Sequence, residues 1–138
     1  MSTVSEVAAA PSALALAHFE ASLAFETDCW DVHHALSTGQ RDFVLLDVRG
    51  SEKYAAGHVP GALDLAHGKI IGSKMAAYPA GTLFVAYCAG PHCNGAARAA
   101  IRLARLGRPV KVMPGGITGW LDEGFALEKA AAASPAMS

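Results

Sequence analysis

The chain has 138 residues, of which 52% are apolar, and its 11 basic and 12 acidic residues leave a formal net charge of −1. This length and composition are typical of one domain with a single core. A nearly neutral chain offers no strongly charged surface, so we expect neither nucleic acid nor a membrane as a partner. No apolar run approaches the roughly 20 residues that span a bilayer, and the N-terminus lacks the positive charge of a signal peptide, which favours a cytoplasmic protein.

Residues 1–22 are rich in alanine and are expected to form a helical extension outside the main domain. Large apolar residues recur from Leu14 to Leu23, and Pro11 precedes them, as is typical of a helix start. Such a helix must be covered by the domain or by a second copy of the chain, so a homodimer through this helix is one expectation. At the other end of the chain, residues 131–138 are expected to form a disordered tail.

Residues 23–130 are expected to form one domain in which strands and helices alternate. Five strands are predicted, at or within residues 22–26, 42–48, 58–66, 81–88 and 109–113. Helices are predicted between and after them, at 27–39, 49–57, 69–78, 94–107 and 117–125. The expected helix caps are Thr27 or Asp28, Ser51 and Asn94, and the expected helix ends are Gly39 and Gly107.

This alternation predicts an α/β fold with a central, mainly parallel sheet of about five strands and helices on both faces. Ligands of such sheets bind beyond the carboxyl ends of the strands. The sequence "YCAGPHCNGAARAA" places Cys88 at the end of a predicted strand, and residues 89–94 connect it to the clearest helix of the chain. We therefore expect a functional site in this loop.

A cysteine at a strand end before a helix can act as a nucleophile. The thiolate is the nucleophile, and the ordinary cysteine pKa of about 8.5 falls where a helix N-terminus and amide N–H groups face the sulfur. Every loop residue except Pro91 has an amide hydrogen to offer, and a turn of such donors around Cys88 forms a nest for an anion. The predicted donors are Ala89, Gly90, His92, Cys93 and Asn94. Neither a metal nor a cofactor is needed for this chemistry.

Four motifs in order carry a family resemblance over roughly residues 23–128. They are "LLDVR", "SEKYAAGHVPGA", "YC" and "PGGITGW". The sequence resembles a single-domain rhodanese of the sulfurtransferase family. The resemblance implies the rhodanese-like fold and a Cys88 nucleophile that accepts a sulfane sulfur from thiosulfate or a persulfide. Cys88 would carry this sulfur as a persulfide and pass it to a thiol or to cyanide.

The loop departs from the pattern of its relatives. Gly90 comes one position early, Pro91 removes an amide donor, and His92 and Cys93 stand where a basic residue is common. A dianion such as thiosulfate therefore lacks its expected cation, unless His92 is protonated or Arg98 turns inward. Use of thiosulfate is the less favoured expectation.

Some phosphatases and arsenate reductases have a fold that resembles the rhodanese-like fold, and they place an arginine six residues after the cysteine. This chain has Asn94 at that position, so the sequence disfavours phosphatase activity. Cys93 has two interpretations: a resolving thiol that attacks a persulfide on Cys88, or a passive loop residue, which we favour. The alternative function is a redox or reactive-sulfur sensing dithiol module of Cys88 and Cys93 without rapid turnover. A zinc site is disfavoured because the loop supplies three ligands at most.

Several residues near the predicted site are interpreted as structural. Asp47 is expected to be a carboxylate at a buried strand end, and Arg49 and Glu52 are expected to pair across the following turn. His58 is assigned to turn architecture. Cys29 is predicted to pack in the core, and Trp120 is predicted to anchor it behind two glycines.

Overall fold

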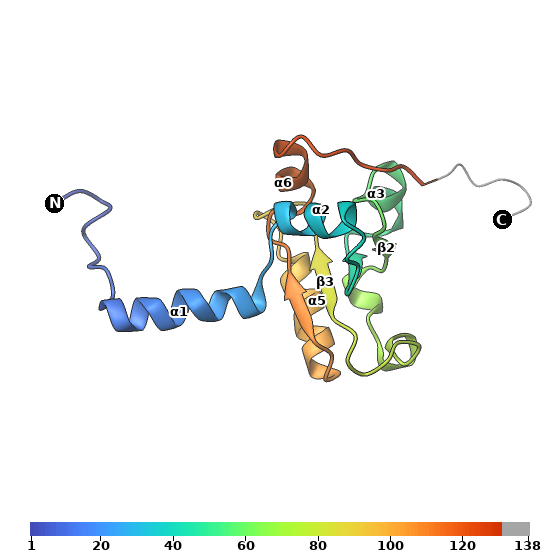
Figure 1. Ribbon diagram of the computed structural model, residues 1–138, viewed down its shortest axis with the longest axis horizontal. Helices are drawn as coiled ribbons and strands as arrows, with labels where there is room; N and C mark the ends of the chain where they lie inside the picture. The colour runs from blue at the N-terminus through green and yellow to red at the C-terminus, as the bar shows by residue number, and fades with distance from the viewer. Residues whose placement is uncertain (131–138) are drawn as a thin grey trace, which may run out of the picture.

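The computed structural model describes residues 1–130 and confirms the predicted α/β fold (Figure 1). The predicted tail at 131–138 lies outside the described residues. One parallel sheet forms the centre of the domain, and its strand order is β2-β1-β3-β4. Its strands are β1 (Val44–Asp47), β2 (Leu63–Asp64), β3 (Phe84–Tyr87) and β4 (Val110–Val112). The sheet therefore has four strands within the described residues, where the sequence predicts about five.

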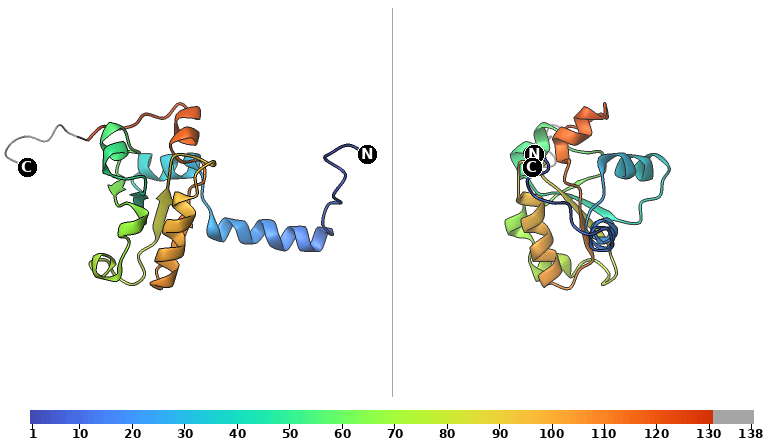
Figure 2. Two further views of the ribbon diagram at one scale, coloured as in Figure 1. Left: turned by 180° about the vertical axis from the view of Figure 1, so that it is seen from behind. Right: turned by 90° about the vertical axis from the view of Figure 1, so that its left-hand side faces the viewer.

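Helices cover both faces of this sheet, as predicted (Figure 2). The covering helices are α2 (Cys29–Ser37), α3 (Ser51–Ala56), α4 (Gly72–Met75), α5 (Gly95–Arg105) and α6 (Gly116–Asp122), with a short 3-10 helix η1 (His67–Lys69) before α4. Helix α1 (Ser12–Phe25) lies outside both layers. Along β1 and β3, side chains alternate between the two faces because successive residues of a strand point in opposite directions. The strands are therefore buried on both sides, which explains their nearly continuous apolar sequences.

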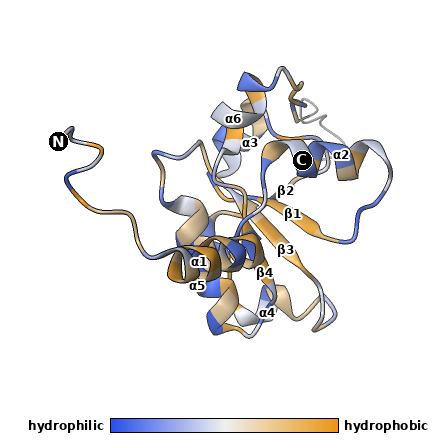
Figure 3. Cartoon of the chain, turned by 60° about the vertical axis from the view of Figure 1, so that its left-hand side comes forward, coloured by the Kyte–Doolittle hydropathy of each residue, from blue (hydrophilic) through white to orange (hydrophobic). Residues whose placement is uncertain are grey.

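Two hydrophobic clusters fill the space between the sheet and its helices. One lies under α4 and α5 and includes Leu46, Ala86 and Cys88, whereas the other lies under α2 and α6 and includes Leu45 and Tyr87. The strands are the most hydrophobic part of the domain in Figure 3. Cys88 thus belongs to the α5 face of the sheet.

The predicted strand at 22–26 is wrong. Helix α1 continues to Phe25, and only Glu26 turns to extended backbone, where it makes a single parallel bridge to Val112 of β4. The amide of Thr27 donates to the Val112 carbonyl over 2.9 Å. The segment from Leu23 to Phe25 continues an alanine-rich helix without a breaking residue, so the fifth strand is reduced to one residue at the sheet edge.

The helix ends confirm some predicted caps and contradict others. Asp28 caps α2 by accepting from the Asp31 amide over 2.7 Å, and Gly39 and Gly107 both have φ of +74° after a helix. Ser51 is not a cap: it is the first residue of α3, after Gly50. Asn94 precedes α5 but does not cap it with its side chain, which accepts instead from Arg98 Nε over 3.1 Å.

Helix α1 projects away from the domain and meets it only near the edge strand β4 (Figures 1 and 2). None of its residues is buried, and its large apolar side chains are between 61% and 72% exposed: Leu14, Leu16, Phe19, Leu23 and Phe25. Within residues 1–130, no helix combines the length and hydropathy that crossing a membrane requires.

Candidate active site at Cys88

Cys88 lies where the sequence predicts it, one residue beyond the carboxyl end of β3. The loop from Cys88 to Asn94 connects this strand end to Gly95, the first residue of α5. The hydrophobic core holds Cys88, which is only 7% exposed. The position of the Cys88 sulfur is therefore fixed by the end of β3 and by the first turn of α5.

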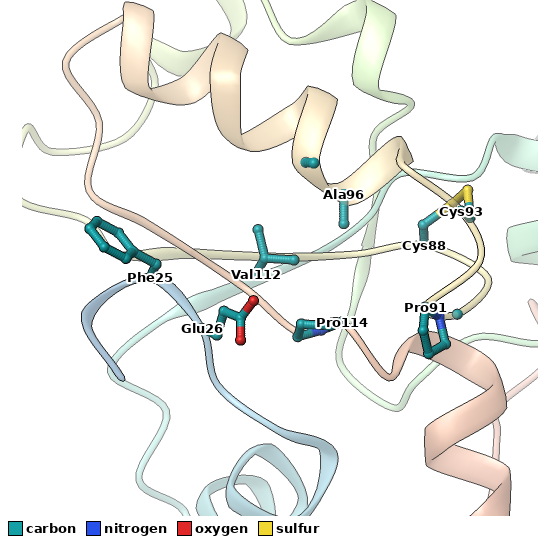
Figure 4. A pocket seen from close by; sticks show the side chains of 10 residues that line it. Phe25, Glu26, Cys88, Pro91, Cys93, Ala96, Val112 and Pro114 are labelled. Carbon is teal, nitrogen blue, oxygen red and sulfur yellow. A yellow bond between two sulfur atoms is a disulfide. The ribbon is translucent and has the colours of Figure 1, made fainter. Parts of the chain in front are cut away.

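A pocket of about 250 Å³ opens beside this sulfur (Figure 4). The Cys loop and the start of α5 form one side of it, and the end of α1 and the segment after β4 form the other. Its lining residues are Phe25, Glu26, Cys88, Gly90, Pro91, Cys93, Ala96, Ala97, Val112 and Pro114. The end of α1 was not predicted to reach this site, and nothing in the sequence of residues 23–26 marks it.

The loop offers amide hydrogens close to Cys88. Within the described residues, the amides of Ala89, Gly90, His92 and Asn94 donate to no carbonyl or side chain. The Cys93 amide differs from the prediction, because it donates to the Gly90 carbonyl over 3.1 Å and closes a turn inside the loop. Four of the five predicted donors therefore have no hydrogen-bond acceptor among the described residues.

Helix α6 supports the loop from behind. The Ile117 amide donates to the Cys88 carbonyl over 3.2 Å, and the Thr118 amide donates to the Ala89 carbonyl over 2.9 Å. Both carbonyls are thereby turned away from the pocket side of the loop, where an oxygen would repel an anion. Thr118 is a positioning residue that the sequence did not reveal, although it lies in the motif "PGGITGW".

Gly116 makes this close approach feasible. Its φ is +56°, and a Cβ built there would collide with the Cys88 carbonyl oxygen and would lie 2.8 Å from the Gly90 amide nitrogen. Any larger residue at this position must push the loop out of place.

Replacing Gly116 with alanine should therefore destabilise the protein by about 2–4 kcal/mol and reduce any activity of Cys88 by more than about tenfold. Gly124→Ala is the matched control, since Gly124 also has positive φ, +82°, but a Cβ at this position would have no atom within 4 Å. Urea denaturation and initial rates measure both effects. Equal losses in the two variants would show that backbone strain, and not the loop contact, explains the result.

Positive charge is lacking around the pocket. Among the described residues, no lysine or arginine lines it, whereas the Glu26 carboxylate does (Figure 4). Arg98 is exposed and bound to Asn94, and His92 is exposed and does not line the pocket. Neither candidate cation of the sequence analysis therefore lines the pocket, although the His92 ring lies beside Gly90, which does. Among residues 1–130, no three His, Cys, Asp or Glu side chains gather as ligands for a metal ion.

Cys88 and Cys93 are joined by a disulfide, with their Cα atoms 6.4 Å apart (Figure 4). Gly95 lies directly behind both sulfurs: a Cβ there would lie 2.8 Å from the Cys88 sulfur and 3.5 Å from the Cys93 sulfur. The sequence analysis did not single out Gly95. Its position at the start of the helix after the Cys loop is the only signal of its role.

The residues predicted to be structural lie on the other face of the sheet and outside the pocket. Asp47 is fully buried and accepts hydrogen bonds from the Tyr87 hydroxyl over 2.7 Å and from the Arg49 guanidinium over 2.7–3.1 Å. Arg49 also donates to the Gly57 carbonyl over 2.5 Å. The Tyr87 hydroxyl accepts from the Val59 amide over 3.0 Å. This network ties the ends of β1 and β3 to the turn after α3.

The pKa values follow from this burial. Burial, followed by the negative charge of Asp47, raises the pKa of Tyr87 far above its ordinary 10.0, so its hydroxyl stays a donor. Burial disfavours the charged form of Arg49, but its hydrogen bonds and attraction to Asp47 prevail and raise its pKa. Arg49 therefore remains a cation beside a carboxylate.

The predicted pairing of Arg49 with Glu52 is wrong. Glu52 is exposed in the first turn of α3, whereas Arg49 turns inward to the buried Asp47, which would otherwise be left without a counter-charge. His58 has the predicted structural role: it is buried, stacks on the Tyr54 ring at 3.8 Å and has its Nδ1 2.9 Å from the Tyr54 carbonyl oxygen.

Cys29 packs in the core on the α2 face, as predicted. Burial, helped by the charges of Asp28 and Glu123, raises its pKa from 9.0 to about 11. In the reduced native protein at pH 8, iodoacetamide should therefore modify Cys88 and Cys93 and leave Cys29 unmodified. Peptide mass analysis measures this, with urea-unfolded protein as the control in which all three react. Equal labelling of Cys29 in both states would contradict its buried position.

The domain that holds this site matches a known protein family. The rhodanese-like domain family matches residues 31–123, which include both sheet faces and the whole Cys loop. The chain belongs to the rhodanese-like domain family. The fold and motif order expected from the sequence are thereby confirmed.

Individual relatives of this rhodanese-like protein include a solved structure and a curated regulator. The crystal structure of BH2092 from Bacillus halodurans is 33% identical, with a TM-score of 0.82 over 86% of this chain and 87% of that chain. The HTH-type transcriptional regulator Rv0324 of Mycobacterium tuberculosis is 35% identical over 91 residues, or 65% of this chain. The match spans only 39% of that regulator's length.

A third relative carries a different description. A protein of unknown function from Rhodopseudomonas palustris, described as a possible tyrosine phosphatase, is 27% identical, with a TM-score of 0.62 over 79% of this chain and 89% of that chain. A fold alone does not determine the chemistry of a protein, so the residues of the Cys loop must decide the function of this chain.

Proposed function

We propose that the protein is a rhodanese-type sulfurtransferase in which Cys88 carries a sulfane sulfur as a persulfide. The single observation that carries this proposal is the place of Cys88, which lines a pocket and begins a loop in which four amides donate to no carbonyl or side chain among the described residues. Preorganised amides stabilise a thiolate, and equally a persulfide anion, without any rearrangement of the loop.

The reaction begins from the reduced loop, because Cys88 has no thiolate while it is bound to Cys93. The Cys88 thiolate attacks the outer sulfur of a donor persulfide, the donor's S–S bond breaks, and the donor leaves as a thiol. A second nucleophile, a thiol or cyanide, then takes the outer sulfur from Cys88 and restores its thiolate. This is a ping-pong reaction with one covalent intermediate.

The charges around the pocket favour a persulfide over thiosulfate as donor. Thiosulfate brings two negative charges into a pocket that offers the Glu26 carboxylate and neither a lysine nor an arginine. A terminal persulfide brings at most one charge to the reacting sulfur. We therefore expect kcat/KM for thiosulfate to be at least about tenfold lower than for glutathione persulfide.

Glu26→Gln should raise kcat/KM for thiosulfate by about two- to fivefold and change that for glutathione persulfide less, because it removes the negative charge at the pocket rim. Thiocyanate formation from cyanide measures both rates. Glu20→Gln is the matched control, an exposed glutamate of α1 that does not line the pocket. The same increase in both variants would mean that net charge matters and the position of Glu26 does not.

Phosphatase chemistry is less well supported. It needs a cation for the phosphate, whereas Asn94 stands at the position of the catalytic arginine of the similar phosphatases and Arg98 is bound to it on the surface. The description of the Rhodopseudomonas palustris relative therefore does not carry over to this loop.

A second candidate function is a reactive-sulfur or redox sensing module, which the Cys88–Cys93 disulfide favours. The relative Rv0324 is named as a transcriptional regulator, and a sensor would suit such a protein. Turnover separates the two functions. Starting from the reduced protein, with glutathione persulfide, excess cyanide and no other reductant, a transferase forms many thiocyanate molecules per chain, whereas a sensor forms about one and stops.

A further inference from the structure

The two cysteines of the loop share one pocket and are within bonding reach. They are joined by a disulfide with a Cα separation of 6.4 Å, a usual distance for such a bond, and both line the pocket beside α5. Cys29 is excluded as a partner, since it is buried across the sheet and its thiol faces the Gly116 carbonyl at 3.7 Å. The loop therefore contains a built pair of thiols.

Two local contacts favour Cys93 as a reacting group and not merely a loop residue. The Gly95 amide lies 3.4 Å from the Cys93 sulfur and donates to it, which stabilises negative charge there. The absence of a side chain at Gly95 also leaves room for the Cys88 and Cys93 sulfurs to meet. The Cys93 amide donates to the Gly90 carbonyl over 3.1 Å, and this turn folds the loop back toward Cys88.

We propose that Cys93 is a resolving thiol, so that the protein also releases sulfide from persulfide donors. This proposal rests on the sulfur-carrying role of Cys88. The Cys93 thiolate attacks the Cys88 Sγ, a Cys88–Cys93 disulfide forms, and the bond to the outer sulfur breaks. The outer sulfur leaves with the electron pair and one proton as hydrosulfide. An external dithiol then supplies two electrons and two protons and restores both thiols.

This reaction gives the loop two outcomes for one intermediate. A competing acceptor that reaches Cys88 first receives the outer sulfur, as in ordinary transfer. Without an acceptor, Cys93 reduces the persulfide, and net turnover consumes one dithiol for each sulfide released. The Cys93 side chain stands where a basic residue would bind an anionic donor. In its place the loop has a thiol that can reduce the persulfide on Cys88.

A single-turnover experiment tests this role. The reduced full chain and its Cys93→Ser variant are each mixed with one equivalent of glutathione persulfide, and released sulfide and intact protein mass are followed. We expect the wild type to release sulfide at least about tenfold faster and to end two hydrogen atoms lighter than the reduced chain. The variant should retain one extra sulfur atom. Cys29→Ser is the matched control and should behave as the wild type does.

The outcomes separate this proposal from the one on which it rests. A wild type that keeps the extra sulfur, and releases sulfide no faster than Cys93→Ser, would overturn the resolving role and leave Cys88 as a sulfur carrier. A failure of both proteins to gain sulfur or to release sulfide would overturn the sulfurtransferase proposal itself.

Discussion

Cys88→Ser is expected to lower sulfur transfer from glutathione persulfide to cyanide by about a thousandfold or more, because a serine hydroxyl is neither ionised nor a sulfur nucleophile near neutral pH. The substitution replaces one small side chain at the end of β3 by another and leaves the loop amides in place. Initial rates of thiocyanate formation by the reduced proteins measure the effect.

Cys29→Ser is the control for a cysteine that lies outside the pocket, and it should keep at least half of the wild-type rate, provided that circular dichroism shows it to be folded. The comparison is specific because Cys29 and Cys88 are both largely buried cysteines of the same domain. Substantial turnover by folded Cys88→Ser would mean that another group carries the sulfur.

Asp47→Ala is expected to have the largest effect on stability, a loss of about 3–5 kcal/mol of unfolding free energy. It removes a fully buried carboxylate that accepts from both Tyr87 and Arg49, and leaves the Arg49 cation in the interior without its counter-charge. Urea denaturation of wild type and variant measures the difference. If Asp47→Ala does not fold, Asp47→Asn, which keeps the shape but not the charge, should show a smaller loss in the same assay.

Glu52→Ala is the matched control for this prediction. Glu52 is an acidic residue five positions away but exposed on α3, so its removal should change the unfolding free energy by no more than about 0.5 kcal/mol. A loss in Glu52→Ala as large as that in Asp47→Ala would contradict the inward pairing of Arg49.

The sequence was sufficient to place the candidate site, because that site depends on connectivity. Cys88 lies between an apolar strand and a helix, which a short loop connects. This order of elements places it at the carboxyl end of β3, whatever the conformation of the loop. The alternation of strands and helices likewise predicted the layers of the fold. Each of these features is predicted from a pattern of several residues, so one misassigned residue does not change the prediction.

The sequence could not predict a contact or an element where two neighbouring residues, or two kinds of secondary structure, fit the local pattern equally well. Arg49 has acidic residues near it on both sides in sequence, and only the burial of Asp47 decides between Asp47 and Glu52. The segment 22–26 suits a helix as well as a strand, and its neighbours in α1 extend the helix through it.

The loop amides show a third limit. A sequence gives the number of N–H groups but not which of them the loop uses for its own turn, as the Cys93 amide does. The support from α6 is equally hidden, since Gly116 and Thr118 approach Cys88 across more than 25 residues of chain. Only the folded arrangement identifies them as positioning residues.

The most direct test of the central claim is to locate the transferred sulfur. Reduced Cys93→Ser, in which the intermediate cannot be resolved internally, is treated with glutathione persulfide, digested and analysed by tandem mass spectrometry. The account predicts one additional sulfur atom on the peptide that contains Cys88, and its removal by cyanide as thiocyanate. An unmodified Cys88 peptide, or additional sulfur on the Cys29 peptide alone, would contradict it.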